Sequence, residues 1–165
     1  MNCSRKSVSR RLGPKCKGIA LLVGRPLGVT CTDIRNWAYD FAKISVMGVS
    51  FCPDTLRWLE KLDCKLDFAV VDLDHFATIN QAIELCLALR RLQPSCKIVL
   101  VSDDVSRDDF GSERKPIADA TLVKPVSRTR FIDTLLFIGP YDETEEVQQL
   151  SYSFGIPTIS AIERR

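Results

Sequence analysis

The sequence predicts an α/β domain in which helices cover a parallel, five-stranded sheet. Five short apolar runs of strand length alternate along the chain with stretches of helical periodicity. The runs are apolar throughout, which is typical of strands that are buried on both faces. Strands that alternate with helices favour parallel pairing through right-handed crossovers. These three observations define the expected fold class.

The length and the charge distribution predict one domain with an extra segment at each end. A chain of 165 residues suits a single domain with some residues to spare. The net charge is +2, yet the first 17 residues carry six basic side chains and no acidic one, which leaves 17 basic and 21 acidic side chains elsewhere. We therefore expect a basic, flexible arm over 1–16, a domain over 17–139 and an extension over 140–165. A mildly acidic domain argues against a globally basic nucleic-acid binder.

The first half of the domain is predicted to hold two strands and two helices. Residues 18–23 form a short run that suits a strand buried on both faces. Thr30 or Thr32 can cap the next helix. The apolar face of that helix has the spacing i, i+3, i+4 and i+7, at Ile34, Trp37, Ala38 and Phe41. A second strand is expected over 45–51, and Pro53 opens the helix that follows.

The second half of the domain continues the alternation of strands and helices. Three further strands are expected, over 68–73, 97–101 and 120–123. A helix is expected over 77–92, and Ser127 can cap a last helix. Residues 105–117 are charged and interrupted by glycine and proline, so they predict the fourth of about five helices only weakly.

The cysteines and the apolar runs indicate a cytoplasmic protein with no membrane span. Seven cysteines, an odd number without a CxxC pair, favour scattered reduced thiols over a disulfide framework or a zinc site. Cys86 falls in an apolar helical run, so we interpret it as a small buried side chain. No apolar run approaches the roughly 20 residues that a membrane helix needs. His75, the single histidine, is interpreted as a surface residue after the third strand.

Four of the predicted strands end at or next to residues that could form a site. These are Gly24-Arg25, Asp72, Ser102 and Lys124. The carboxyl ends of parallel strands lie at one rim of the sheet, where open α/β sheets bind their ligands. A carboxylate, a hydroxyl and an ammonium brought together there suit a phosphoryl group, with the carboxylate as its acceptor.

On these residues the chain from about 17 to 139 resembles the receiver domain of bacterial two-component response regulators, the family of the chemotaxis response regulator. The matching motifs are Val70-Val-Asp-Leu73, Val99-Leu-Val-Ser102 and Leu122-Val-Lys-Pro125. The resemblance implies a flavodoxin-like, doubly wound sheet of order 2-1-3-4-5 with helices on both faces. It also implies that Asp72 is the phosphoacceptor, Ser102 the switch hydroxyl and Lys124 the cation that faces the phosphate.

The sequence departs from the receiver pattern where the metal would bind. Receivers end their first strand in an acidic pair that holds Mg²⁺ together with the acceptor, and this chain has Gly24 and Arg25 there. Neither side chain can ligate a hard cation, which needs several oxygen ligands. Arg25, if it turns inward, could pair with Asp72 and neutralise the site without metal. We therefore expect no metal, although Asp72, Asp74 or Asp103 could supply an oxygen to a weak site.

Two other departures concern the switch and the first loop. Active receivers usually have an aromatic residue three positions before the lysine, where this chain has Thr121. A threonine cannot make the rotation that such an aromatic makes when the hydroxyl moves. The loop over 24–32 is also longer than we expect between the first strand and its helix.

The function expected from this reading is signalling by protein contact. The chain is interpreted as a stand-alone, atypical pseudo-receiver in a phosphorelay system, not an enzyme, with no cofactor and little or no Mg²⁺-dependent phosphorylation. Its expected partner is a histidine kinase or another regulator, and a homodimer is possible. One alternative is a working receiver that is phosphorylated on Asp72 with Mg²⁺. Another is a regulator that touches nucleic acid through the basic arm, although that arm has no interleaved aromatics.

Overall fold

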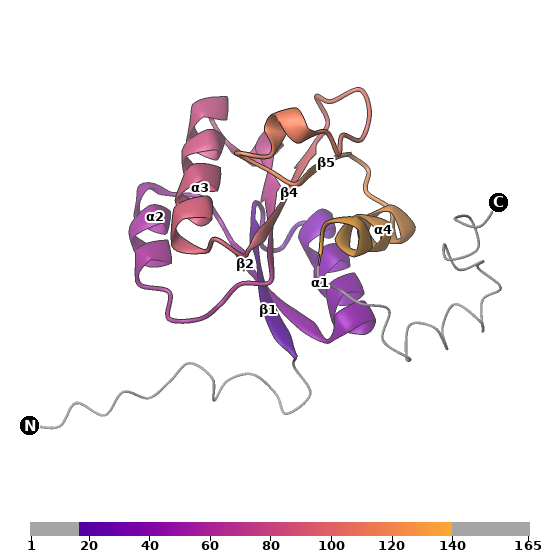
Figure 1. Ribbon diagram of the computed structural model, residues 1–165, viewed down its shortest axis with the longest axis horizontal. Helices are drawn as coiled ribbons and strands as arrows, with labels where there is room; N and C mark the ends of the chain where they lie inside the picture. The colour runs from indigo at the N-terminus through magenta and orange to yellow at the C-terminus, as the bar shows by residue number, and fades with distance from the viewer. Residues whose placement is uncertain (1–16, 140–165) are drawn as a thin grey trace, which may run out of the picture.

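The five strands form one parallel sheet in the order β2-β1-β3-β4-β5, as the resemblance implied. The computed structural model describes residues 17–139 (Figure 1). The expected arm over 1–16 and extension over 140–165 lie outside this range. The strands are β1 Gly18–Val23, β2 Ile44–Val49, β3 Phe68–Asp72, β4 Lys97–Ser102 and β5 Ala120–Val123. The α-helices are α1 Val29–Ala42, α2 Pro53–Glu60, α3 Ile79–Leu92 and α4 Arg128–Ile138, with short 3-10 turns η2 Leu73–His75 and η3 Ser112–Arg114.

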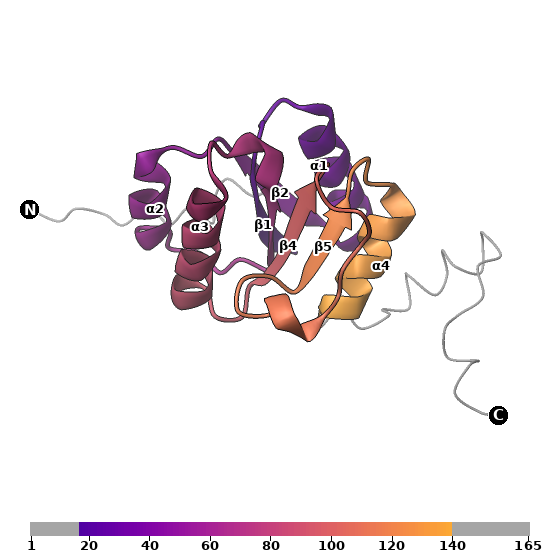
Figure 2. The ribbon, with the colours of Figure 1, turned by 90° about the horizontal axis from the view of Figure 1, so that it is seen from above.

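The sheet separates two hydrophobic cores, one on each face. In β1, Ala20 and Leu22 face the core under α1 and α4, whereas Leu21 and Val23 face the core under α2 and α3. The helices cover the two faces in these same pairs (Figures 1 and 2). The central strands β1, β3 and β4 therefore need apolar side chains in both directions, which explains why their sequences show no polar alternation.

An aromatic cluster joins α1, α4 and the sheet on one of these faces. Phe131 of α4 is fully buried. Its ring centroid lies 6.1 Å from that of Trp37 in α1 and 5.9 Å from that of Phe68 in β3. Truncation of a buried phenylalanine typically costs about 3–5 kcal/mol. Phe131 therefore anchors the last helix, and with it the loop that carries Lys124.

The first helix begins earlier than the sequence indicated. Its N-cap is Gly28, not Thr30 or Thr32, and both threonines lie within the first turn. A tight turn, closed by a hydrogen bond from the Gly28 N–H to the Arg25 carbonyl at 3.0 Å, lets the helix start at Val29. The expectation of a long first loop is thus wrong, because the connection between β1 and α1 covers only 24–28.

The expected helix over 105–117 is absent, and η3 is the only helical turn in that segment. Asp109 instead forms an antiparallel bridge with Thr121 on the outer edge of β5, with backbone hydrogen bonds of 2.9 and 2.8 Å. Arg130 of α4 pairs with Asp108 through two hydrogen bonds. The segment has no apolar stripe to bury as a helix, so its acidic side chains and backbone bind β5 and α4 instead.

The thiols and the helix lengths agree with the remaining expectations. Cys86 is buried in α3, as predicted, and the five cysteines within 17–139 are free thiols. Burial raises the pKa of both Cys86 and Cys96 to about 12. Within residues 17–139, no helix has the length and hydropathy needed to cross a membrane.

Candidate functional site

The residues predicted to meet at the carboxyl rim of the sheet do so. Asp72 is the last residue of β3, Ser102 ends β4, and Lys124 directly follows β5. The parallel register aligns these ends, since Asp72 lies opposite Val101 and Ser102 lies opposite Val123. Gly24, which follows β1, is buried beside them.

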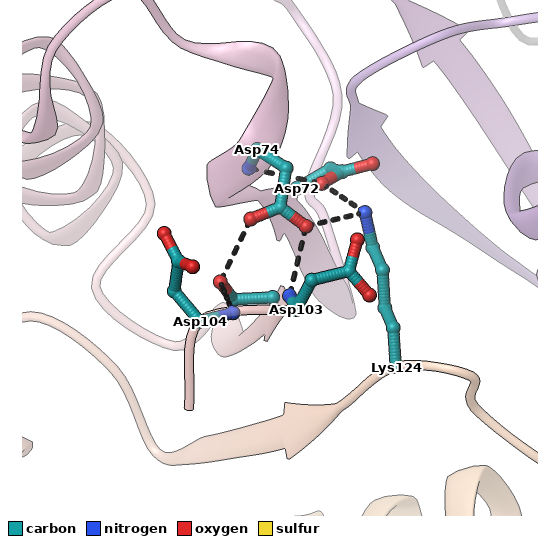
Figure 3. A network of polar contacts seen from close by, with 6 residues as sticks. Asp72, Asp74, Asp103, Asp104 and Lys124 are labelled. Atoms are coloured by element: carbon teal, nitrogen blue, oxygen red, sulfur yellow. Dashed lines mark hydrogen bonds and ion pairs between the residues drawn. The ribbon is translucent and has the colours of Figure 1, made fainter. Parts of the chain in front are cut away.

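The ammonium of Lys124 holds two carboxylates at once (Figure 3). Its Nζ donates to Asp72 Oδ1 at 2.6 Å and to Asp74 Oδ2 at 2.9 Å. The three side chains are 14–27% exposed, so water screens these pairs less than it screens surface pairs. Burial lowers the pKa of Lys124, but the hydrogen bonds and charges of the two carboxylates outweigh it and raise that pKa overall. Lys124 is therefore cationic throughout the physiological range.

Asp74 is the most connected carboxylate of the site. It lies in η2, two residues after Asp72, and its backbone N–H donates to Asp72 Oδ1 at 3.2 Å. Its carboxylate accepts hydrogen bonds from Ser102 Oγ at 2.8 Å, from the Asp103 N–H at 2.9 Å and from Lys124 Nζ. Burial raises the pKa of Asp74, yet these donors lower it overall. The sequence suggested Asp74 only as an oxygen for a metal, and its two-residue spacing from Asp72 was the available signal.

The hydroxyl of Ser102 forms two hydrogen bonds, and the backbone of Thr121 is paired with a neighbouring segment. Ser102 Oγ donates to Asp74 Oδ1 and accepts from the Asp104 N–H at 3.0 Å, so both of its functions are engaged. Thr121 is buried in β5, where its backbone is paired with Asp109.

Arg25 does not turn inward to pair with Asp72, the arrangement that the sequence left open. The side chain is exposed, and among residues 17–139 the cation that pairs with Asp72 is Lys124. The turn that starts α1 uses the carbonyl of Arg25 and sets the position of its backbone. Arg25 nevertheless contributes to the wall of a cavity of about 350 Å³ that also contacts Asp72, His75 and Lys124. His75 is thus partly buried at this wall rather than a plain surface residue.

The oxygen atoms at this rim do not fit a divalent cation. Mg²⁺ needs near-octahedral oxygen coordination, usually with help from carboxylates. Asp72 and Asp74 already bind the Lys124 ammonium, and the two residues after β1 contribute no acid. Over the described part of the chain, no three His, Cys, Asp or Glu side chains are grouped so that they could hold a metal.

A second, larger hollow lies beside the site. It measures about 800 Å³ and runs between α3 and the segment after β4. Its wall includes Ile79, Ile83 and Cys86 of α3, Leu100 of β4, and Ile117. The segment over 105–117, which does not form the expected helix, borders this hollow through Val105, Arg114 and Ile117.

Comparison with solved structures assigns the fold to a known class. No protein-family model and no curated protein matches the sequence. A response regulator from Burkholderia pseudomallei, solved with a phosphorylated aspartic acid, a calcium ion and citrate, is 19% identical, with a TM-score of 0.56 over 86% of this chain and 76% of that one. A response regulator from Thermotoga maritima is 16% identical, with a TM-score of 0.56 over 73% of this chain and 97% of that one.

Proteins of another role share the same fold. The pilus assembly protein CpaE from Caulobacter crescentus is 14% identical, with a TM-score of 0.54 over 73% of this chain and 92% of that one. The chain therefore has the flavodoxin-like fold of response regulator receiver domains. Identities this low establish the fold and leave the function to be argued from the site.

Proposed function

We propose that the chain is an atypical receiver that signals by protein–protein contact, without Mg²⁺-dependent phosphorylation of Asp72. The proposal rests on the ammonium of Lys124, which binds the carboxylates of Asp72 and Asp74. After β1 this chain has Gly24 and Arg25 in place of the acidic pair of receivers. The class of protein is thus a signalling module, not an enzyme, and a cytoplasmic location is part of the proposal.

The electrostatics of the rim support this reading. Phosphoryl transfer depends on positive charge that neutralises the oxygens of the transferred group. Four carboxylates, those of Asp72, Asp74, Asp103 and Asp104, and three cations, Lys124, Arg25 and Arg114, line the two cavities at this rim. A phosphodonor dianion that approaches Asp72 meets carboxylates on several sides, and Lys124, the cation that contacts Asp72, is already engaged by Asp72 and Asp74. Lys124 also occupies Asp72 Oδ1, which leaves this oxygen a weaker nucleophile.

The surface beside the site suits contact with another protein. Leu27 is 93% exposed and Val29 is 78% exposed, and both lie in the short stretch around the start of α1. Val29 also forms part of the wall of the acceptor-site cavity. Large apolar side chains that stay in water next to a charged rim are a common mark of an interaction surface. The proposed partner is a histidine kinase, another regulator or a second copy of this chain.

A working receiver is the second candidate function. Asp72, Ser102 and Lys124 lie together at one rim, in the positions that the resemblance assigns to acceptor, switch hydroxyl and cation. In that case a kinase phosphohistidine would transfer its phosphoryl group to Asp72. This candidate requires Asp74 to leave Lys124 and to help bind Mg²⁺.

Incubation with acetyl phosphate and Mg²⁺, followed by intact mass measurement, separates the two candidates. We expect the wild-type protein to stay unmodified under conditions that label a working receiver run in parallel. The matched control is Asp72→Asn, which should give the same mass profile as wild type before and after incubation. A phosphoryl adduct on wild type that Asp72→Asn abolishes would overturn the proposal in favour of the working receiver.

A further inference from the structure

Three hydrogen-bond donors, from the ends of two strands, converge on one carboxylate at this site. The Ser102 hydroxyl ends β4, the Asp103 N–H begins the following loop, and the Lys124 ammonium follows β5. All three donate to the carboxylate of Asp74, at 2.8, 2.9 and 2.9 Å (Figure 3). These donors lie at or directly after the carboxyl ends of β4 and β5, whereas Asp74 lies in the short turn η2.

A hydroxyl, a backbone N–H and an ammonium that point at one place form a binding site for an oxyanion. Charge-assisted hydrogen bonds of this kind are short and about twice as strong as neutral ones. Asp74 is anchored at this place from the other side as well, because its own N–H binds Asp72 Oδ1. The carboxylate of Asp74 therefore sits directly beside the carboxylate of Asp72, and both share Lys124.

We propose that Asp74 is a resident ligand of an oxyanion site beside Asp72, and that its carboxylate occupies the donors that an oxyanion on or near Asp72 would need. The inference deepens the proposed function, since it names what regulates the same site. The carboxylate of Asp74 thus takes the place that an external anion would otherwise occupy. Ser102 is consequently held toward the site at all times, and no external anion is needed to bring it there.

The covalent connection gives Asp74 an advantage over any anion from solution. A side chain tethered two residues from Asp72 is already at its binding place and loses little freedom when it binds. An external oxyanion has to displace a carboxylate that makes three hydrogen bonds, and it also has to approach the charge of Asp72. We therefore expect the vacant site to become measurable only after the Asp74 carboxylate is removed.

Chemical rescue of Asp74→Ala tests the inference. Two probes, sodium formate and inorganic phosphate, are added to wild type, Asp74→Ala and Asp103→Asn, with sodium chloride at equal ionic strength as reference. The melting temperature and the amide exchange rate of Asp103 are measured for each. Asp103→Asn is the matched control, because it removes a carboxylate from the same loop and keeps the backbone donor. Asp74→Asn, which has nearly the same shape as the native residue, serves as a second variant if Asp74→Ala folds poorly.

We expect Asp74→Ala to speed exchange of the Asp103 amide by about tenfold or more, because a hydrogen bond to a charged group is lost. Formate or phosphate should restore both the exchange protection and the melting temperature in a saturable way, and should have no such effect on wild type or Asp103→Asn. Unchanged exchange in Asp74→Ala, or no rescue by either anion beyond that of chloride, would overturn the inference. The rescue experiment measures no phosphoryl transfer, so its failure overturns the inference and leaves the proposed function standing, whereas labelling of wild type at Asp72 would overturn the proposed function.

Discussion

Replacement of Arg130 by methionine should destabilise the domain and release the segment that follows β4. The guanidinium donates to both carboxylate oxygens of Asp108, to the Pro125 carbonyl at 3.0 Å and to the Val123 carbonyl at 3.1 Å. Asp108 Oδ1 also accepts the Val123 N–H at 2.8 Å. One side chain thus fixes the loop, the end of β5 and the start of α4 together.

The magnitude follows from the hydrogen bonds and their exposure. A hydrogen bond to a charged group typically contributes about 1.5–3 kcal/mol when buried, whereas an exposed ion pair contributes at most about 1 kcal/mol. The Arg130 side chain is 36% exposed and that of Asp108 is 25% exposed, so screening removes part of this energy. We expect Arg130→Met to lower the free energy of unfolding by about 2–3 kcal/mol. Arg130→Lys should lose about 1–2 kcal/mol, because an ammonium cannot reproduce the two-pronged contact.

Urea unfolding of a double-mutant cycle measures the contribution of the pair. Arg130→Met, Asp108→Ala and the double variant are compared with wild type, and we expect a coupling energy of about 1–2 kcal/mol. Arg128→Met is the control, since this exposed neighbour should change stability by no more than about 0.5 kcal/mol. A coupling energy near zero, or equal effects of Arg130→Met and Arg128→Met, would refute the reasoning.

Two further predictions concern protons and thiols. Burial raises the pKa of Asp108, but its hydrogen bonds from Arg130 and Val123 and the charge of Arg130 outweigh this effect, so its folded pKa lies below the ordinary value. The unfolded chain then binds this proton more readily, and the stability that Asp108 provides should be complete near neutral pH and lost as the pH falls through the lowered pKa. Unfolding experiments on wild type and Asp108→Asn should show a stability difference that shrinks on acidification; a constant difference would contradict this. For the thiols, the hydroxyl of Thr55 lowers the pKa of the exposed Cys52, whereas burial raises that of Cys86 to about 12. Iodoacetamide at mildly alkaline pH should therefore alkylate Cys52 well before Cys86, as peptide mapping would show, and prior labelling of Cys86 would contradict the burial.

The central strands were predictable because a strand that is buried on both faces is apolar at nearly every position. Both faces of β1, β3 and β4 lie in a core, so their sequences are continuous apolar runs that local inspection detects. The point where each apolar run stops also predicts the carboxyl end of the strand. The sequence alone could for this reason place Asp72, Ser102 and Lys124 at one rim.

The features that sequence analysis missed depend on contacts between distant residues. The conformation of 105–117 is set by Arg130, which lies 22 residues after its partner Asp108, and no local pattern encodes that pair. The sequence left open whether Arg25 turns inward to pair with Asp72, and its exposed position beside a four-residue turn over 25–28, with Lys124 as the partner of Asp72, is visible only in the structure. The role of Asp74 was missed because its three donors come from the ends of β4 and β5.

We propose that the rim of this receiver fold is a closed network of ion pairs and hydrogen bonds rather than a cation site. A titration with Mg²⁺, followed through the backbone amide resonances of Asp72, Asp74 and Lys124, tests it most directly. We predict that millimolar Mg²⁺ produces only the small, non-saturating shifts that the same ionic strength of sodium chloride produces. Saturable shifts confined to these residues, absent from Asp72→Asn, would contradict the account.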